Sequence, residues 1–416
     1  MSLSKHGAGF FSILLTELEM FVFESGNIAA ATGAKLARVQ VIAAYPITPQ
    51  TPLTEKLSEY VDSGVLDAQY VAVESEHSAL AVCIGASSTS ARAFTATSAN
   101  GLLYMAEQLH WAAGARLPLV MCVVNRGVGA PFNIWNDHQD SISQRDSGWI
   151  QIYAKDHQEI LDSVIKAYRL SEEVCIPVMI CYDGYYLSHT YMPYDVPDQF
   201  AVDAFLPPYE YRHNLGPKKP TNLNTVTLPG GRPDIHGEFA PGYMELRECL
   251  HVEMVQAIDI YTRIDGDFAE IIGRGGNPIA ERYLCDDADY VAVALGSMAN
   301  QIKDVVSRLR EEGLKVGLLA LALYRPFPSE FLASELSGRK GVIVFEKAIS
   351  FGHSGALCTD LQAALYPCAS RPLVSNYILG LGGRSYQSSD FYDAIRDCVG
   401  RGSANFQNPA WIGLGR

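Results

Sequence analysis

Two polar segments follow hydrophobic runs of the sequence and carry residue types that can bind a ligand. The first is YPITPQTP at residues 45–52, where three prolines stiffen the chain and Thr48 presents a hydroxyl group. The second is VESEHSA at residues 73–79, where Glu76 precedes a nearly all-apolar stretch and is therefore expected to be partly desolvated. The alternatives are an N-cap threonine at Thr48 and a helix-capping glutamate at Glu76.

Two further segments have the same arrangement. FTATSANG at residues 94–101 combines small polar residues, among them Ser98 and Asn100, with a glycine that lets a ligand approach the backbone. A polar loop then runs through residues 125–146, and Arg126 stands at its start, where a hydrophobic strand ends. A guanidinium group in that place can clamp a carboxylate, and a structural salt bridge to a loop aspartate is the alternative.

The elements that position these segments are expected to be buried parallel strands. Between residues 31 and 187, short apolar runs alternate with longer amphipathic ones, and the runs are nearly unbroken in hydrophobicity, as in strands covered on both faces. In such a sheet, ligands bind at the carboxyl ends of the strands. We expect strands at 39–45, 70–73, 93–97, 117–124 and 177–182, and helices at 52–61, 77–86, 102–113 and 157–174.

A second alternating block follows a long connector. Residues 193–242 are dense in proline, glycine and asparagine, which predicts a segment that wraps rather than packs. Beyond it we expect helices at 245–261, 300–312, 328–336, 354–365 and 390–398, with strands at 290–295, 315–323, 341–345 and 373–378. The predicted fold class is α/β with two open parallel sheets, divided into an extension (1–25), a first domain (26–192), a linker (193–243) and a second domain (244–416).

Composition excludes several classes of function. The net charge of −14 over 416 residues gives no electrostatic support for nucleic-acid or anionic-membrane binding. The nine cysteines form no C-x-x-C pair, which indicates a reducing compartment and no zinc or iron–sulfur site on this chain. The apolar segment at residues 9–23 is too short to span a membrane, so we expect an ordered extension and a cytoplasmic protein. Walker and Gly-x-Ser-x-Gly patterns are also absent from the sequence.

Taken together, the segments resemble the α subunit of the 2-oxoacid:ferredoxin oxidoreductases, the pyruvate synthase family. The resemblance covers residues 26–384 and is carried by the motifs YPITPQTP, VESEHSA, ARAFTATS with GLLYM, NIWNDHQDSISQRDSGWIQ, YRPFP and GLGGR. It implies that the first block is the pyrimidine-binding domain of a thiamine-diphosphate enzyme. It also implies that the second block is a domain like the C-terminal domain of transketolase.

The resemblance also implies roles for individual residues. Glu76 matches the glutamate that contacts N1′ of the aminopyrimidine, with Thr48 and Ser98 as further cofactor contacts. Thr48, Arg126 and Asn100 match positions that bind the 2-oxoacid. In the family a β subunit holds the diphosphate and its Mg²⁺, γ and ferredoxin-like δ subunits complete the complex with iron–sulfur clusters, and coenzyme A takes the acyl group.

Two departures from the family pattern bear on the substrate. Gly127-Val128-Gly129 stands where pyruvate enzymes usually have Ala-Leu-Ser, and Asn100 stands where glutamine is common. These smaller residues predict a pocket for an acid larger than pyruvate, for example phenylglyoxylate. The alternatives to this function are a non-redox thiamine-diphosphate enzyme and a catalytically silent scaffold subunit. The sequence leaves open the final electron acceptor, the stoichiometry and the direction of flux.

Overall fold

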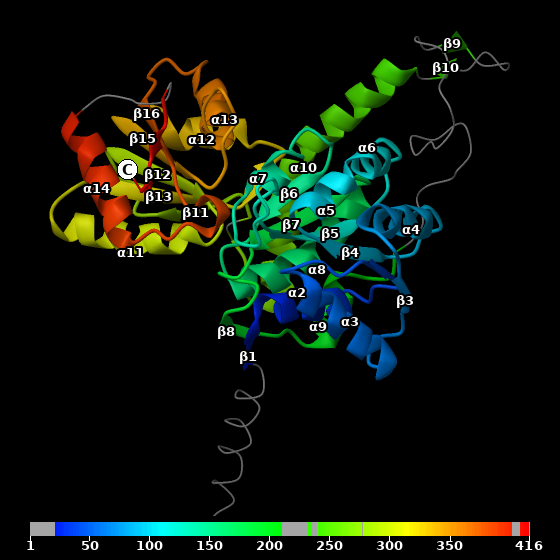
Figure 1. Ribbon diagram of the computed structural model, residues 1–416. Helices are drawn as coiled ribbons and strands as arrows, with labels where there is room; N and C mark the ends of the chain where they lie inside the picture. Colours follow the sequence, from blue (N-terminus) through cyan, green and yellow to red (C-terminus); the bar gives the residue numbers. More distant parts are fainter. Residues whose placement is uncertain are drawn as a thin grey trace, which may run out of the picture.

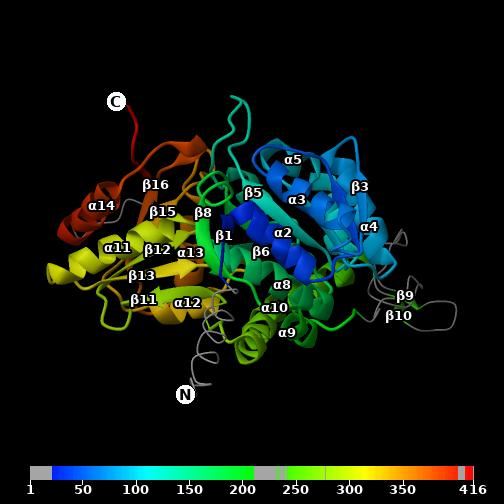
Figure 2. The ribbon, with the colours of Figure 1, turned by 90° about the horizontal axis from the view of Figure 1, so that it is seen from below.

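The computed structural model describes residues 21–209, 232–233, 239–240, 242–276, 278–401 and 408–415. Over these ranges the chain forms two α/β blocks that lie side by side, each built on one large sheet (Figures 1 and 2). The first sheet has seven strands in the order β14-β6-β7-β5-β4-β2-β3, and the second has six in the order β11-β13-β12-β15-β16-β17. The predicted fold class is therefore confirmed.

The first sheet is parallel except at one edge, where β14 runs antiparallel to β6. All residues of its central strands β5 and β7 are buried, which explains the unbroken hydrophobic runs. Its strands are β2 (Val41–Ala44), β3 (Gln69–Ala72), β4 (Ala93–Thr97), β5 (Val120–Asn125), β6 (Ile150–Tyr153), β7 (Val178–Asp183) and β14 (Leu323–Arg325).

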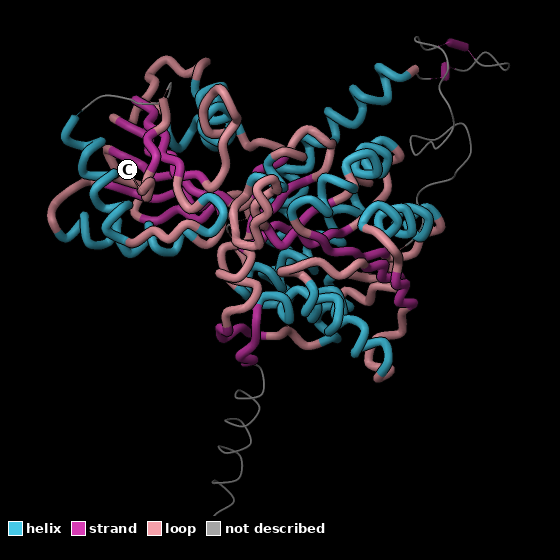
Figure 3. The backbone as a smooth tube through the Cα atoms, in the orientation of Figure 1, coloured by secondary structure: helices cyan, strands magenta, loops and turns pink. Residues whose placement is uncertain are grey.

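Helices cover both faces of this sheet. Figure 1 shows α4, α5 and α6 on one side and α2, α3 and α8 on the other, and Figure 3 shows the same layers as helices around a central band of strands. The bounds are α2 (Gly26–Leu36), α3 (Thr51–Asp62), α4 (Glu76–Ser88), α5 (Ala99–Tyr104), α6 (Ala106–Gly114), α7 (Gln139–Ile142) and α8 (His157–Val174).

Small residues and caps fix these helices in place. A Cβ on Gly33 would lie 2.9 Å from the Leu161 carbonyl oxygen, so only glycine lets α2 pack this closely on α8. The Asp156 side chain accepts a hydrogen bond from the Glu159 N–H at 2.8 Å and starts α8. The predicted helix at 102–113 is instead divided into α5 and α6 at Met105, although its apolar stripe is buried as expected.

The second block repeats the layered plan around a smaller sheet, in which β11 is the antiparallel edge strand. Its core includes Phe345 stacked on Tyr377, with ring centroids 5.5 Å apart. The bounds are β11 (Ala280–Tyr283), β12 (Tyr290–Leu295), α11 (Met298–Glu311), β13 (Val316–Leu321), α12 (Ser329–Leu336), β15 (Gly341–Glu346), α13 (Ala356–Leu365), β16 (Leu373–Ile378), η1 (Leu381–Gly383), α14 (Ser388–Arg401) and β17 (Ala410–Trp411).

The connection between the blocks differs from the sequence expectation. Strand β8 (Tyr191–Asp195) and helix α9 (Gln199–Phe205) occupy the start of the expected linker, and β8 pairs with β1 (Phe21–Ser25). Helix α10 (Tyr243–Ile272), expected to open the second block, packs on α8, α9 and α6 of the first. Most of the expected extension (residues 1–20) and most of residues 210–241 lie outside the described residues.

A buried ion cluster joins the two blocks. The Asp183 carboxylate at the end of β7 accepts hydrogen bonds from Lys347 Nζ at 3.0 Å and from the Ser297 N–H at 3.0 Å, and it lies 2.6 Å from His138 Nε2. Burial favours the neutral acid, but the Lys347 ammonium and the contacts with His138 and Ser297 hold the pKa of Asp183 well below its usual range. The carboxylate is therefore a charged link between the sheets.

Along the described ranges, no helix is both long and apolar enough to cross a lipid bilayer.

Candidate active site

The predicted site residues gather at the carboxyl edge of the first sheet, where the segments after β2, β4 and β5 meet. Arg126 Nη1 donates a hydrogen bond to the Thr48 carbonyl oxygen at 2.6 Å, which joins the segments after β5 and β2. The start of α4 lies against the segment after β4, because Glu76 contacts Gly101. Parallel strands bring their carboxyl ends to one edge, so four segments far apart in sequence form one site.

Glu76 is the first residue of α4 and lies beneath the segment after β4. Its side chain is buried, and the neighbouring Ser75 caps the helix by accepting a hydrogen bond from the Ser78 N–H at 3.2 Å. A Cβ on Gly101 would lie 2.6 Å from Glu76 Oε1 and 2.7 Å from Thr97 Oγ1. Glycine at position 101 is therefore required for this carboxylate to reach its place.

The Thr97 hydroxyl faces the same Gly101 position as this carboxylate. Thr97 and Ser98 are fully buried, and in the described part of the chain their hydroxyl oxygens have no hydrogen-bond partner. Buried polar atoms in native proteins are nearly always paired with protein, water or ligand. A carboxylate beside orphaned hydroxyls fits the polar edge of a heteroaromatic ring, and the residues present therefore suit an aminopyrimidine.

Arg126 is almost fully buried and is oriented by main-chain oxygens. Its Nε donates to the Asn133 carbonyl oxygen at 2.9 Å, in addition to the bond to Thr48. Burial lowers the pKa of Arg126, and the nearby Asp140, Tyr185 and Glu76 oppose that effect. The group remains a cation, since arginine does not lose its proton in proteins.

Within the chain, Asn100 and Thr48 each bind a neighbouring segment of the site. The Asn100 amide is bound on both sides by Gly129, accepting from its N–H at 2.9 Å and donating to its carbonyl oxygen at 3.3 Å. The Thr48 carbonyl oxygen accepts the hydrogen bond from Arg126, and the Thr48 side chain is exposed. Asn100 thus holds the loop after β5, in which the Phe132 ring lies 5.3 Å from the Arg126 guanidinium.

Protein atoms occupy the space beside the two glycines of this loop, more tightly at Gly127 than at Gly129. A Cβ on Gly127 would lie 3.1 Å from Asp137 Oδ2, so a small residue there relieves crowding against the buried Asp137 carboxylate. A Cβ on Gly129 would make ordinary contacts of 3.6 Å with Asn100 and Phe132. The glycine at position 127 therefore does not enlarge a substrate pocket.

Sequence reasoning missed Asp140, which lies on α7 at the centre of this edge. Its carboxylate is fully buried and accepts hydrogen bonds from the Ala99 and Arg126 N–H groups at 2.9 and 3.0 Å. The only signal in the sequence was its place in the polar run NDHQD at residues 136–140. A run of five polar residues does not show which of them turns inward.

The GLGGR segment of the second block completes the edge. Gly382 N–H donates to Asp137 Oδ2 at 3.0 Å, and Asn133 Nδ2 donates to the Gly382 carbonyl oxygen at 3.2 Å. The Gly383 N–H donates to the Asn136 carbonyl oxygen at 2.7 Å. Two motifs 245 residues apart in sequence therefore dock on each other beside the site.

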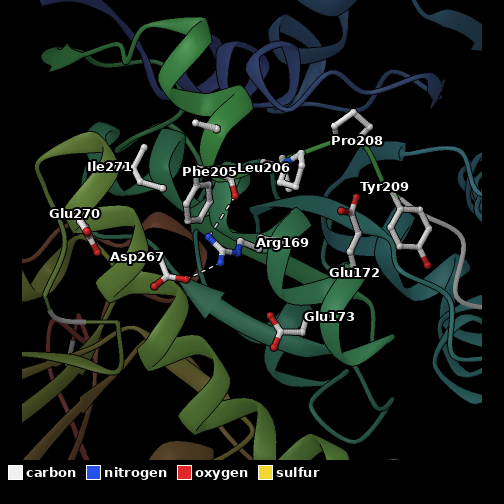
Figure 4. Close-up of a pocket in the computed structure, with 12 residues that line it drawn as sticks. Arg169, Glu172, Glu173, Phe205, Leu206, Pro208, Tyr209, Asp267, Glu270 and Ile271 are labelled. Atoms are coloured by element: carbon white, nitrogen blue, oxygen red, sulfur yellow. Dashed lines mark hydrogen bonds and ion pairs between the residues drawn. The ribbon is translucent and has the colours of Figure 1, made fainter.

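A cavity of about 600 Å³ lies at the opposite edge of the sheet, between α8, α9 and α10 (Figure 4). Its Arg169 donates to Asp267 Oδ2 at 2.5 Å and to the Phe205 carbonyl oxygen at 3.3 Å. The α8 helix runs back from the carboxyl edge, so its last turns, which line this cavity, are remote from Glu76. This cavity is not part of the candidate site.

Comparison with known families assigns the fold and the site to a class. A sequence model described as "Pyruvate flavodoxin/ferredoxin oxidoreductase, thiamine diP-bdg" matches residues 32–248. A second, described as "Pyruvate:ferredoxin oxidoreductase core domain II", matches residues 288–391. The first match spans the site residues of the first block, and its description agrees with a thiamine-diphosphate-binding sheet.

Curated relatives extend the match over nearly the full chain. "Pyruvate synthase subunit PorA" of Methanocaldococcus jannaschii is 46% identical over 395 residues, which cover 94% of this chain and 97% of the relative. "Ketoisovalerate oxidoreductase subunit VorA" of Pyrococcus abyssi is 44% identical over 367 residues, covering 88% and 90%. The chain belongs to the 2-oxoacid:ferredoxin oxidoreductase family, as an α-type subunit.

A solved structure shares the fold. The 2-oxoglutarate:ferredoxin oxidoreductase from Magnetococcus marinus, solved with 2-oxoglutarate, coenzyme A and succinyl-CoA bound, superposes with a TM-score of 0.67 at 21% sequence identity. The match covers 91% of this chain and 65% of that chain, so this protein spans about two thirds of the length of its solved relative.

Proposed function

We propose that this chain is the subunit that holds the aminopyrimidine of thiamine diphosphate in a complex that oxidises a 2-oxoacid. The products are an acyl-CoA and CO₂, and two electrons leave to iron–sulfur clusters on partner subunits. The observation that carries the proposal is the buried Glu76 carboxylate against Gly101, within the region that matches the thiamine-diphosphate-binding model. When bound, thiamine diphosphate supplies the nucleophilic carbon and the electron sink for decarboxylation.

Glu76 is the group that exchanges a proton with the cofactor ring. Its carboxyl oxygen holds the proton at N1′, and burial keeps water from competing for that hydrogen bond. The Thr97 hydroxyl faces the same Gly101 position as the Glu76 carboxylate, and the buried hydroxyls of Thr97 and Ser98 would offer polar contacts to the ring edge. Gly101 leaves the space above Oε1 open, since any side chain there would collide with the carboxylate.

Arg126 and Thr48 orient the 2-oxoacid. The hydrogen bonds from Arg126 to the Thr48 and Asn133 carbonyl oxygens use two of its five N–H donors, so the others are available to a carboxylate. The Thr48 hydroxyl is exposed on the same segment and is available to the 2-oxo oxygen. Low exposure of the guanidinium strengthens its attraction for the substrate carboxylate.

The remaining parts of the site are assigned to partner subunits. In the described ranges, no group of three or more His, Cys, Asp or Glu side chains is arranged to hold a metal ion. A β subunit would hold the diphosphate and Mg²⁺, and γ and ferredoxin-like δ subunits would complete the complex with the clusters. The printed names of the relatives, which call them subunits, support an assembly of this kind.

The substrate proposed is an acid larger than pyruvate, such as phenylglyoxylate. Support comes from the Phe132 ring, which is 80% exposed and lies over the Arg126 guanidinium, where it offers an apolar surface to an aryl or branched group. The family includes relatives named for pyruvate and for ketoisovalerate, so both are necessary comparisons.

The test is coenzyme-A-dependent reduction of a viologen dye by the purified native complex with pyruvate, ketoisovalerate and phenylglyoxylate. We expect Glu76→Gln to lower kcat with every acid by at least about 100-fold, because it removes the proton-sharing group. The matched control is Glu74→Gln, since Glu74 is exposed two residues earlier and bonds only to Ser75 and Ser78 among described residues.

Each outcome has a definite meaning. Full activity of the Glu76 variant would contradict the cofactor role and favour a scaffold subunit. Glu76-dependent turnover without dye reduction would favour a non-redox thiamine-diphosphate enzyme. Faster turnover of pyruvate than of either larger acid would contradict the substrate proposal alone.

A further inference from the structure

Asp140 uses both oxygens of its carboxylate on groups at the candidate site. Oδ1 accepts hydrogen bonds from the Asn125 side-chain amide and from the Ser141 N–H, both at 2.7 Å. Oδ2 accepts from the Ala99 N–H at 2.9 Å and from the Arg126 N–H at 3.0 Å. Four donors from three segments of the chain therefore converge on one buried side chain.

The two donors on Oδ2 belong to different parts of the site. Ala99 follows Ser98 at the end of β4, in the segment that lies on Glu76. Arg126 follows Asn125 at the end of β5 and carries the proposed substrate cation. A single oxygen atom thus ties the cofactor side of the site to the substrate side.

The backbone at Ala99 depends on this bond. Its φ is +46°, a left-handed conformation that a residue with a Cβ seldom adopts. A charge-assisted hydrogen bond from its N–H to a carboxylate is stronger than a neutral one and holds the turn. The turn places Ser98 and Asn100 on either side of Ala99, next to Gly101.

Asp140 remains an acceptor at neutral pH. Burial raises its pKa to about 6, and the bonds from Asn125, Ala99 and Arg126 oppose this rise. An ionised carboxyl group has no proton of its own, so all its lone pairs point at donors. Its negative charge also faces Arg126 and supports the cation there.

We infer that Asp140 is a positioning residue, which sets the spacing between the cofactor segment after β4 and the Arg126 guanidinium after β5. The inference rests on the proposed function, because it gives these two segments their roles. Reacting groups must be held to within a fraction of an ångström for efficient chemistry, so a shift of one strand end lowers turnover.

A purely structural role is the alternative, and the chain contains a matched control for it. Glu346 is also a buried carboxylate that accepts from two main-chain N–H groups, of Leu357 at 2.8 Å and Cys358 at 3.0 Å, and from the Asn376 amide at 2.8 Å. It lies in the second block at the end of β15, and its carboxylate binds second-block donors rather than the segments that carry Glu76 and Arg126. Comparing variants of Asp140 and Glu346 therefore separates the effect of losing any buried, hydrogen-bonded carboxylate from the effect of losing the one that joins the two site segments.

The experiment compares Asp140→Asn with Glu346→Gln in the purified complex. We measure kcat and KM for the 2-oxoacid, the Kd of thiamine diphosphate by calorimetry on cofactor-depleted complex, and Tm. For Asp140→Asn we expect kcat to fall at least about 10-fold and the cofactor Kd to rise at least threefold. For Glu346→Gln we expect kcat and Kd to stay within twofold of wild type, whatever its Tm.

The inference is overturned if Asp140→Asn keeps kcat and Kd within twofold, or if Glu346→Gln loses as much of both. If Asp140→Asn does not assemble, Asp140→Glu keeps the charge but moves the acceptors, and the same losses of kcat and Kd are expected of it. Glu76→Ala runs in the same series. Full activity of that variant contradicts the proposed function, whereas an inactive Glu76→Ala beside a normal Asp140→Asn contradicts the positioning role alone.

Discussion

At the scale of single residues, a few ionisable side chains are buried, and each has a different environment. Arg126 is oriented by two carbonyl oxygens, and Asp183 is held ionised by Lys347 and His138. Glu346, by contrast, accepts from neutral donors, the Leu357 and Cys358 N–H groups and the Asn376 amide. Because unpaired buried charges are costly, such a carboxyl group ties stability to pH.

The stability of the second block is expected to depend on the protonation of Glu346. Burial raises the pKa of Glu346 to about 7, above the ordinary 4.5. The folded state therefore binds a proton more tightly than the unfolded state between pH 4.5 and 7. This term adds stability below pH 4.5, which is lost as the pH rises through 7, and its full size is about 3 kcal/mol.

Thermal unfolding of the wild-type complex and of Glu346→Gln at several pH values measures this term. The Tm of wild type relative to the variant should rise as the pH is lowered from 8 to 5. A difference that does not change with pH would contradict the assignment.

At the scale of elements, the sequence predicted strands best where they are buried and continuous. The expected strands at 93–97, 290–295 and 373–378 agree with β4, β12 and β16 in both bounds. Among the elements that were missed, α2 and β6 have ambiguous patterns. Helix α2 is rich in glycine and alanine, and β6 is a four-residue strand inside a longer polar region. Close packing on α8 stabilises α2 as a helix, and pairing with β7 stabilises β6 as a strand.

The site was predictable only as a set of segments. Their place at strand ends indicated the correct edge of the sheet, and the resemblance supplied the roles. Sequence could not show that the Asn100 amide is engaged by Gly129, or that Gly127 lies against Asp137, because both facts depend on loop conformation. Nor could it select Asp140 from a polar run.

Contact between α4 and the segment after β4 makes Gly101 sensitive to substitution. In Gly101→Ala the new Cβ would lie 2.6 Å from Glu76 Oε1, so the carboxylate must move. We expect kcat to fall at least about 10-fold. Gly266→Ala on α10 is the control, since a Cβ there meets nothing within 4 Å, and a helical alanine adds about 0.5–1 kcal/mol of stability. Equal activities of the two variants in the dye assay would contradict the close contact.

At the scale of the whole molecule, the two blocks are interlocked. Strand β14 comes from the second block in sequence but completes the first sheet, and α10 packs on the helices of the first block. The Asp183–Lys347 pair and the GLGGR segment add polar links. Alternating patterns identify each sheet but not a strand or helix that crosses between blocks, so this arrangement was not predictable from the sequence.

Docking of the GLGGR segment makes a residue of the second block important for the site. Gly383 has φ +75°, and a Cβ there would lie 2.3 Å from Trp135 Cβ in the loop after β5. Gly383→Ala should displace that loop and lower kcat at least about 10-fold in the dye assay. Gly338→Ala has the same backbone cost, with φ +81°, but meets nothing within 4 Å. If both variants lose activity equally, backbone strain rather than docking is responsible.

The central claim is that Glu76 activates the cofactor, and the exchange of the thiazolium C2 proton of bound thiamine diphosphate with D₂O tests it most directly. The exchange rate is measured by proton NMR after acid quench in wild type, Glu76→Gln and the control Glu74→Gln. We predict exchange at least about 100-fold slower in Glu76→Gln and unchanged in the control. Equal rates in wild type and Glu76→Gln would contradict the account.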